Sequence, residues 1–475
     1  MSSTAITRSN PGREASRLDR EDSLSTKSRR PTADHLIGSV PEMRRFGTEQ
    51  GFCVVNARAG DHHDIHALLV SVLHQPSSAE FQAQLDDPFY EPNDRLLVKR
   101  GNQIVAHARI SNREMHLSGR LLPISSLSDL VVLPEYRGED CALELVHAAE
   151  CAMIESGSQM AFLRTRQPGF FARFGWTVGA RHSYSTAGAR DILSRLQQRE
   201  TPAHNPLAPD VPPTSIRMWR HVELAALTRL YKQKSEHAYG PLTRTDAYWQ
   251  WLVSRRAYDS IYVAIHGPDK LELDDTLTPI VGYAVMQEGR IVELVTAPHH
   301  RDAAAELLAR ACGDAIERDL HHIRVDAAPD ESLHQIFAEA GGRGCFDESD
   351  QGEVTMVKAF DPMQLLVDFF DLMHERAKDA GLSLPCDLGL MIGGKRYAIS
   401  IRQRTVKLLH EKLGRSYLEC DSGQLTQLLL GHLDVAEAVE AGKIIASTRV
   451  ATETASLLFP RLPFWRPTFD DLQAQ

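Results

Sequence analysis

Residues 130–176 read LVVLPEYRGEDCALELVHAAECAMIESGSQMAFLRTRQPGFFARFGW, and no other stretch says as much about the fold. An apolar run, Leu130 to Leu133, stops at Pro134, and apolar residues then recur at helical spacing from Ala142 to Met153. A second apolar run, Met160 to Leu163, follows the helix. The order strand, turn, helix, strand predicts a βαβ-like unit, and the exposed amides at such a helix start can hold a phosphate.

Length and composition narrow the class of protein. A chain of 475 residues is too long for one ordinary core, so we expect two to four domains. Hydrophobic residues make up 43% and charged residues 24%, and no apolar run approaches the ~18 residues needed to span a bilayer. The start of the chain lacks a charged segment followed by an apolar one, which argues against secretion. We therefore expect a cytoplasmic protein without a membrane span.

Cysteine usage and net charge exclude further classes. The seven cysteines are scattered and form no CxxC pair, which is typical of reduced thiols and predicts neither a disulfide framework nor a zinc site. The histidine-rich segment 61–66 has neighbouring side chains that diverge around a helix, so we expect a solvated helix start and no metal. A net charge of -10 argues against a nucleic-acid partner.

The chain divides into five segments, which together predict an α+β fold. Residues 1–45 are polar and lack an apolar pattern, as in a disordered leader. Residues 46–198 form the first predicted domain, and a proline-rich linker at 199–214 contains TPAHNPLAPDVPPT. The same order of elements then recurs over 215–360. Residues 361–475 combine an apolar helix with short strands, predicting a third, α+β domain.

The second copy differs from the first at the turn that opens its helix. That turn reads HHRDAA from His299 and contains no glycine. Without glycine the backbone has no close approach to a phosphate, so we expect this copy to be structural.

The 130–176 stretch resembles the acetyl-CoA-binding core of the GCN5-related N-acetyltransferases (GNATs). That family has V-x-P-x-x-R after an apolar strand, R-x-x-G-x-G/A at the helix start, and a later F-Y-x-x-x-G-F. Here the elements read Val132-Leu133-Pro134-Glu135-Tyr136-Arg137, then Arg137-x-x-Asp140-x-Ala142, then Phe170-Phe171-x-x-x-Gly175-Trp176. Asp140 replaces the central glycine, and Phe171 stands where the family often has tyrosine.

The order of the segments resembles a more specific group. The pieces LTQLLLG at 425–431 and LLFP at 457–460 resemble the end of sterol-carrier-protein-like domains. Two GNAT-like units followed by such a domain is the layout of the "enhanced intracellular survival" acetyltransferases. The resemblance implies two GNAT-like mixed-sheet domains before a sterol-carrier-protein-like α+β domain, and a homo-oligomer.

The resemblance also implies a site for acetyl-CoA as co-substrate. The backbone of Leu130, Val131 and Val132 would pair with the pantetheine. The pyrophosphate would lie at the helix start, which comprises Arg137, Gly138, Glu139, Asp140, Cys141, Ala142 and Leu143. Two interpretations of Asp140 stay open: its carboxylate repels the phosphate, or it caps the helix and points away.

Catalytic residues are harder to assign, because a phenyl ring at Phe171 cannot donate a proton. Asp129 stands where many GNATs place an acidic general base, and the hydroxyl of Tyr184 is a second candidate. In the survival-protein group the chain-terminal carboxylate also serves as a base. Leu472 matches that position here, but three residues follow it.

The sequence therefore predicts an N-acetyltransferase that moves acetyl from acetyl-CoA to an amine of a small molecule or to a lysine of a peptide. The alternative is a catalytically silent relative that binds CoA, lipid or a protein partner through the same clefts. Asp140 and Phe171 favour the alternative.

Overall fold

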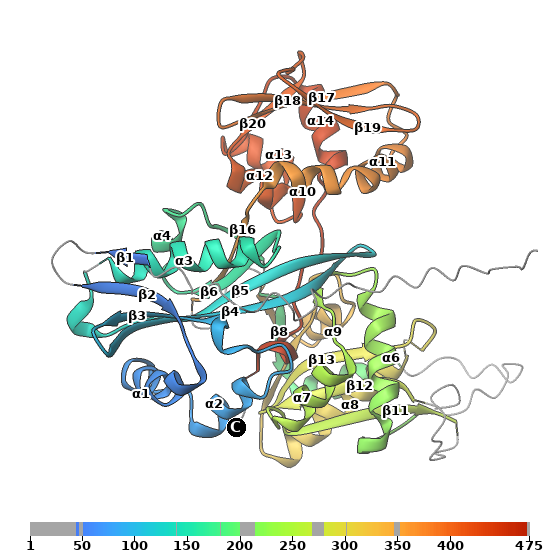
Figure 1. Cartoon of the computed structure of the whole chain (residues 1–475). Coiled ribbons are helices and arrows are strands. Elements are labelled where there is room, and N and C mark those ends of the chain that lie inside the picture. The colour runs from blue at the N-terminus through green and yellow to red at the C-terminus, as the bar shows by residue number, and fades with distance from the viewer. Residues whose placement is uncertain are drawn as a thin grey trace, which may run out of the picture. The chain divides into compact units, whose positions relative to one another are not determined.

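The computed structural model describes residues 44–46, 51–138, 140–180, 182–199, 214–267, 280–300, 302–345 and 352–472. Within these ranges the chain is an α+β protein with three mixed sheets (Figure 1). The expected leader, 1–45, lies outside the described residues except for Arg44 and Arg45, and most of the expected linker, 200–213, does as well.

The first sheet has the order β1-β2-β3-β4-β5-β6-β16-β7, with β10 paired to β4. Its strands are β1 (Arg44–Phe46), β2 (Phe52–Asn56), β3 (Arg95–Arg100), β4 (Gln103–Leu117), β5 (Arg120–Val132), β6 (Met160–Thr165), β7 (Thr177–Ala180), β10 (Tyr239–Leu242) and β16 (Val354–Ala359). The helices of this segment are α1 (His62–Leu73), α2 (Ser78–Leu85), α3 (Cys141–Glu155) and α4 (Pro168–Ala172).

Helix periodicity explains how the first sheet is covered. The apolar stripe of α3, with Leu145, Val146 and Ala149, is fully buried in one core with residues of β3 and β4. Helix α1 buries Ile65 and Leu69 in a separate core that also contains residues of β3, β4 and β5. The strand-helix-strand unit predicted at 130–176 is thus present as β5, α3 and β6.

The second sheet has the order β15-β8-β14-β13-β12-β11-β9. Its strands are β8 (Tyr184–Gly188), β9 (Thr214–Met218), β11 (Ser260–His266), β12 (Ile280–Gln287), β13 (Arg290–Thr296), β14 (His322–Asp326) and β15 (Arg343–Cys345). The helices are α5 (Ala189–Arg199), α6 (Leu224–Ser235), α7 (Asp246–Ser254), α8 (Asp302–Glu317) and α9 (Leu333–Glu339).

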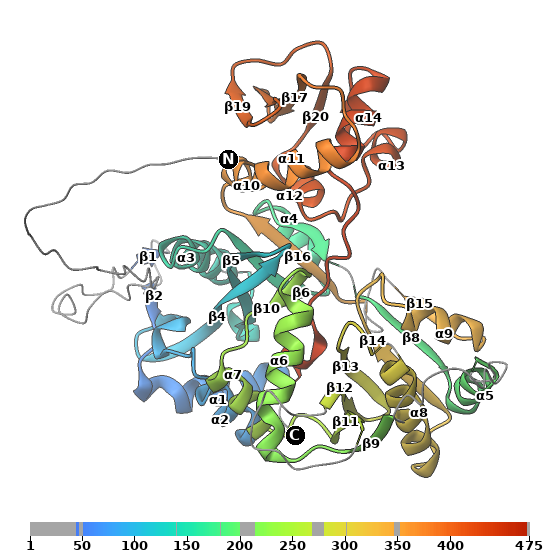
Figure 2. The ribbon, with the colours of Figure 1, turned by 90° about the vertical axis from the view of Figure 1, so that its right-hand side faces the viewer.

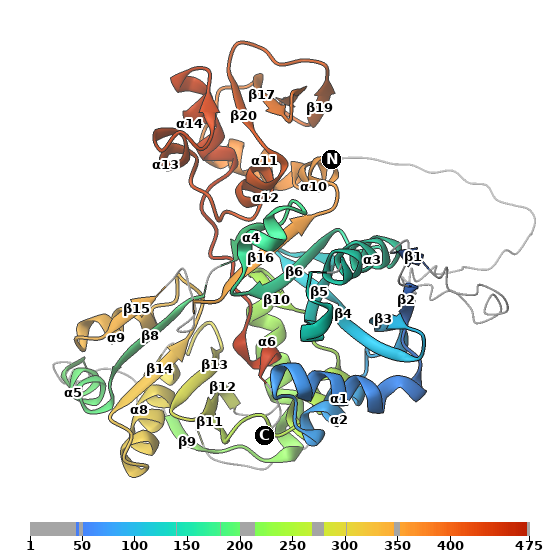
Figure 3. The same ribbon diagram turned by 90° about the vertical axis from the view of Figure 1, so that its left-hand side faces the viewer.

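The two sheets exchange strands. Strand β8 lies within the first predicted segment, 46–198 (the first unit), but pairs antiparallel with β14 in the second sheet (Figure 3). Strand β16 lies within the second predicted segment, 215–360 (the second unit), but pairs antiparallel with β6 of the first sheet (Figure 2). It also pairs antiparallel with β7 of that sheet. The first two sheets therefore cross the predicted segment limits, 46–198 and 215–360. As domain boundaries, these limits stay a prediction.

The third sheet has the order β19-β18-β17-β20-β21. Its strands are β17 (Cys386–Ile392), β18 (Lys395–Ile401), β19 (Val406–His410), β20 (Tyr417–Cys420) and β21 (Ile445–Ala446). The helices are α10 (Pro362–Asp368), α11 (Phe370–Asp379), α12 (Ser422–Leu429), α13 (Val435–Glu440) and α14 (Arg449–Leu458).

A C-terminal tail, residues 459–472, leaves the third segment and enters the cores of the other two. Phe464 stacks on Phe162 of β6, with the ring centroids 6.0 Å apart. The tail then forms the 3-10 turn η7 (Thr468–Asp471), where Phe469 is completely buried beside Trp249 and Tyr283. The tail thus becomes part of the second unit's core.

Candidate active site

Strands β5 and β6 run side by side and then part. Their parallel pairing extends from Ile124–Met160 to Leu127–Leu163, whereas β5 continues to Val132 and β6 to Thr165. Beyond Leu127 the facing backbone groups do not bond each other, although a buried backbone needs hydrogen-bond partners. An extended amide-containing ligand can supply them.

A β-bulge lies at the same point of β5. The pairing of β4 with β5 shifts between His107 and Arg109, where Asp129 and Leu130 oppose Ala108 alone. Asp129 has a φ of 52°, a left-handed conformation that is uncommon outside glycine. Bulges of this kind re-aim side chains next to active sites, and this one turns Asp129 toward the cavity described below.

A buried row of polar side chains holds the bulge. His107 Nδ1 donates to the Asp129 carbonyl oxygen at 2.9 Å, and Arg95 Nη1 donates to His107 Nε2 at 3.1 Å. Arg95 also donates to Gln84 Oε1 at 2.8 Å, and both Arg95 and His107 are completely buried. Burial, with a smaller contribution from Arg95, lowers the pKa of His107 to about 4. The imidazole is therefore neutral at pH 7, and its hydrogen bonds fix the tautomer.

The predicted phosphate turn precedes α3. Gly138 has a φ of 98°, and a Cβ added there would meet nothing within 4 Å, so the turn is open to a ligand. Asp140 occupies the N-cap position and is exposed, but its side chain makes no capping hydrogen bond. The helix-capping interpretation of Asp140 is therefore not seen. Glu139 lies outside the described residues.

A cavity of about 690 Å³ opens at the bulge. It is lined by α2, β4, β5 and β6 of the first unit, by α7, β13 and β14 of the second, and by the C-terminal tail. Among the described residues, seven arginines and seven carboxylates line it. The cavity is thus strongly polar without an excess of acid.

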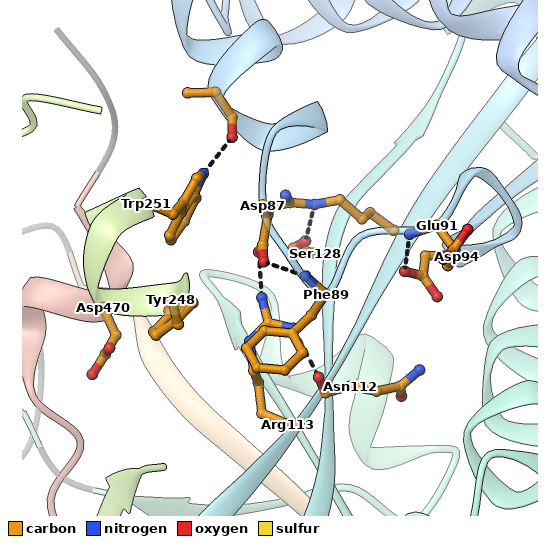
Figure 4. Close-up of polar contacts among 12 residues, drawn as sticks. Asp87, Phe89, Glu91, Asp94, Asn112, Arg113, Ser128, Tyr248, Trp251 and Asp470 are labelled. Carbon is orange, nitrogen blue, oxygen red and sulfur yellow. Dashed lines mark hydrogen bonds and ion pairs between the residues drawn. The ribbon is translucent and has the colours of Figure 1, made fainter. Parts of the chain in front are cut away.

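At the first-unit side of the cavity, arginines and carboxylates pair one to one. Arg109 Nε lies 3.0 Å from Asp129 Oδ2, and Arg113 pairs with Asp87. Figure 4 shows Arg113 between Asp87 and the ring of Phe89, and Arg113 Cζ lies 4.6 Å from that ring's centroid. Burial alone would raise the pKa of Asp129, but Arg109 above all lowers it below its ordinary value. Asp129 is therefore ionised at neutral pH and is a weak base.

An aromatic wall from α7 faces the pair of Asp87 and Arg113 (Figure 4). Tyr248 stacks on Trp251 with ring centroids 5.1 Å apart, and Trp251 Nε1 donates to the Ala83 carbonyl at 2.7 Å. Burial raises the pKa of the Tyr248 hydroxyl, so this group keeps its proton. The wall offers flat apolar area to an acceptor but no base.

Ionic contacts anchor the tail at the opposite side of the cavity. Arg244 donates to Glu293 of β13 at 2.8 and 2.6 Å and to Asp470 at 2.9 and 3.0 Å, and these three side chains are almost completely buried. Asp471 pairs with both Arg164 and Arg466. Burial raises the pKa of Asp471, but the two arginines reverse this effect and hold the pKa below the ordinary value.

The predicted site residues fall in different places. Asp129 lines the large cavity. Leu143, in the first turn of α3, lines a separate cavity of about 410 Å³ together with residues of α3, of the segment directly after α4, and of β16. Tyr184 lies on β8, where the guanidinium of Arg324 stacks on its ring, 3.7 Å from the centroid. Phe171 is buried against Trp176 in the core of the first unit.

Sequence reasoning missed the arginine-rich half of the site and the row behind the bulge. Arg95 and His107 lie in stretches of β3 and β4 that are buried on both faces, and no local pattern marks them. No local pattern marks Asp470 and Asp471 either, which directly precede Leu472. The one available signal was the charge of Arg290 and Arg324 at strand positions, where apolar residues are the rule.

Comparisons with known proteins agree with this geometry. Residues 54–179 match the family model described as "Acetyltransferase (GNAT) domain". A search of curated proteins finds no match. Among solved structures, a GCN5-related N-acetyltransferase from Anabaena variabilis is similar, with a TM-score of 0.64 and 14% identity, over 87% of this chain and 99% of that chain.

Two further solved structures are similar to most of the chain. One is a GCN5-related N-acetyltransferase from Kribbella flavida, with a TM-score of 0.62, 18% identity, and coverage of 87% of this chain and 97% of that chain. The other is Eis1 from Mycobacterium abscessus, with a TM-score of 0.58, 15% identity, and coverage of 86% and 97%. At these identities the likeness establishes the fold, and the family model assigns residues 54–179 to a GNAT acetyltransferase domain.

No described helix is long and apolar enough to cross a membrane. In the described ranges, no group of three or more His, Cys, Asp or Glu side chains is placed to hold a metal ion.

Proposed function

We propose that this protein is an acetyl-CoA-dependent N-acetyltransferase that acetylates an amine bound in the 690 Å³ cavity. The observation that carries the proposal is the parting of β5 and β6 after Leu127 and Leu163. It coincides with the bulge at Asp129, opens onto the cavity, and lies inside the segment that matches the GNAT model.

In this proposal acetyl-CoA binds on the parted strands. The backbone of Leu130, Val131 and Val132 pairs with the pantetheine, as a third strand would. The pyrophosphate lies at the start of α3, formed by residues 137–143, where first-turn amides lack acceptors inside the helix and the dipole favours an anion. Gly138 permits the close backbone approach, and Asp140 weakens the site by its charge.

The transfer requires a deprotonated amine next to the thioester. The bulge fixes Asp129 at the junction of the cavity and the parted strands, so we propose its carboxylate as the group that accepts the amine's proton, directly or through water. Its lowered pKa makes it a weak base, and most of the rate enhancement would then come from holding amine and thioester together. Tyr184 lies on β8 beneath Arg324, and a direct proton-donating role stays a prediction.

The rest of the chain is included in the proposal. Residues 215–360 would form a second, structural GNAT-like domain, and residues 361–475 a sterol-carrier-protein-like domain that packs on the others. We also propose a homo-oligomer, which sedimentation velocity on the full chain would test: a purely monomeric protein contradicts it.

Isothermal titration of acetyl-CoA and CoA into the purified protein tests the core of the proposal. Heat of binding at micromolar ligand is expected. No heat at high micromolar ligand, with folding verified by circular dichroism, excludes the acetyltransferase. If acetyl-CoA binds, a thiol-release assay across an amine panel follows, and binding without turnover on any amine favours the silent CoA-binding alternative.

A further inference from the structure

Two arginines of the second sheet share one carboxylate in the wall of the cavity. Arg290 on β13 and Arg324 on β14 are register partners in the parallel pair. Arg290 Nε donates to Asp326 Oδ2 at 2.6 Å, and Arg324 Nε donates to Asp326 Oδ1 at 2.6 Å. Asp326 is 2% exposed, whereas the arginine side chains are 30% and 19% exposed and line the cavity. In these described contacts, two guanidinium groups thus bind one carboxylate.

The neighbouring cluster repeats this arrangement. Arg164 and Arg466 share Asp471, and Arg255 donates to the Leu472 carbonyl at 2.7 Å. The other tail carboxylate, Asp470, binds the buried Arg244, which also binds Glu293. Among the described residues, these two clusters thus place four arginines on two carboxylates.

His182 connects the two clusters. It lines the cavity and is influenced by a charged pair from each cluster: Arg164 with Asp471, and Arg324 with Asp326. Burial and the two arginines lower its pKa to about 4, so it is neutral at pH 7. Among the described residues its buried Nε2 has no hydrogen-bond partner, which is unusual for a buried polar atom and leaves it available to a ligand.

The two ends of the cavity therefore differ in charge. At the bulge, Arg109–Asp129 and Arg113–Asp87 are one-to-one pairs. At the far end, the described contacts place Arg290 and Arg324 on Asp326, and Arg164 and Arg466 on Asp471. Glu80 and Glu353 also line the cavity, and the acids do not outnumber the arginines overall. A polycation would find mainly carboxylates that already bind arginine, so this charge pattern favours a different acceptor.

We propose that the acceptor carries a carboxylate in addition to its amine, and that Arg290 and Arg324 bind this carboxylate while the amine faces Asp129. The acceptor class is an amino carboxylate, either free or at the C-terminus of a peptide. The planar guanidinium of Arg324, stacked on Tyr184, is already oriented for such a contact. This inference rests on the proposed acetyltransferase function and specifies its substrate.

Matched pairs of acceptors test the inference. Lysine and β-alanine are compared with lysinamide and β-alaninamide, which keep the amine and lose the anion, and a short peptide ending in lysine is compared with its C-terminal amide. We expect kcat/KM to be at least about tenfold higher for each carboxylate form. In Arg290→Gln this ratio should fall toward one, with KM for acetyl-CoA unchanged.

Two further variants serve as controls. Arg318→Gln removes an arginine of the same unit that pairs with Asp259 and Asp314 outside the cavity, and it should leave the ratio unchanged. Arg290→Lys keeps the charge and loses the planar fork, so a partial loss of the ratio is expected. It also keeps the test available if Arg290→Gln does not fold.

Three outcomes are distinguishable. Equal rates for carboxylate and amide forms, or a ratio that Arg290→Gln leaves intact, overturn the inference while the proposed function stands. Failure of acetyl-CoA to bind overturns the proposed function itself. If acetyl-CoA binds but no acceptor reacts, titration of the same pairs into CoA-saturated protein decides: the inference requires tighter binding of the carboxylate forms, and equal or absent binding contradicts it.

Discussion

Each of the first two sheets contains a parallel pair of strands that part along their length, and the two partings end differently. In the first sheet β5 and β6 part after Leu127 and Leu163, next to the bulge and the cavity. In the second, β13 and β14 pair only at Arg290–Arg324 and Ile291–Val325. There β13 packs against the chain's own tail, with Phe469 buried beside Val292 and Val295.

The difference shows how one arrangement of elements serves two purposes. The turn before α3 has Gly138 with a positive φ and open space around it, whereas the turn before α8 has no glycine. In the second sheet the tail brings its own charge, Asp470, to Arg244 and Glu293. The first parting thus lies beside the cavity and an open turn, whereas β13 of the second packs against an ionic contact and an aromatic side chain from the chain itself.

The contact of the tail with β13 is the place where a single change should have the largest effect. Arg244→Met would leave Glu293 and Asp470 buried without their countercharge, and we expect a loss of about 3–5 kcal/mol in the free energy of unfolding. Urea denaturation measures this. Arg318→Met, at a partly exposed pair, should cost no more than about 1 kcal/mol. Equal costs would mean that the tail contact does not stabilise the second unit.

The first parting depends on a neutral histidine, which predicts a pH dependence. His107 has a pKa of about 4 in the folded protein, below the ordinary value of 6.5, so between these values the unfolded chain binds a proton that the folded chain does not. Stability should therefore fall as the pH decreases from 6.5 to 4, by up to about 3 kcal/mol from this residue.

Denaturation of the wild type and of His107→Gln at pH 7 and pH 4.5 measures that contribution. The variant lacks the titrating group, so it should lose less stability between the two pH values. Its acetyl-CoA affinity should also fall, because the bulge loses the bond to the Asp129 carbonyl. Parallel pH curves for the two proteins would show that His107 is not held neutral by its surroundings.

The glycine before α3 separates backbone strain from ligand binding. Gly138→Ala and Gly157→Ala both place a side chain at a positive φ with open space around it, so each should cost roughly 1 kcal/mol of stability. Only Gly138→Ala should weaken acetyl-CoA binding, by about tenfold or more, because a Cβ blocks the approach of the phosphate. Similar affinities in titration calorimetry would place the phosphate elsewhere.

Asp140 provides the smallest and most specific test of the open turn. Asp140→Gly removes an exposed charge that makes no capping bond, and acetyl-CoA binding should tighten by about two- to fivefold at low salt. The gain should shrink at high ionic strength, since salt screens exposed charges. Unchanged affinity would mean that the carboxylate stays clear of the phosphate.

Sequence reasoning succeeded where the signal is local. The apolar spacing from Ala142 to Met153 predicted α3, and the run from Leu130 predicted the end of β5, because each depends on neighbours within a few residues. The strand exchange was not predictable in this way. Val354 to Ala359 reads as a strand, but its pairing with β6 depends on residues nearly two hundred positions earlier.

In the candidate site too, some features depend on local sequence and others on contacts between distant segments. Asp129 was accessible from the GNAT resemblance and its place directly before the apolar run from Leu130, whereas its pairing with Arg109 and its link to His107 depend on the register of β4. The arginines opposite come from β13, β14 and the tail, which no periodicity connects. A charged residue in a strand indicates that a partner is needed, but it does not identify that partner.

By itself the sequence determined the order of elements, the GNAT-like turn with Gly138 and Asp140, and the lack of glycine in its counterpart, because these properties depend on local backbone chemistry. Only the tertiary structure decided that β8 and β16 change sheets, that the tail packs against β13, and that the cavity has an arginine-rich end. These features arise from contacts between distant segments, whose energies depend on burial and on the partner that folding supplies.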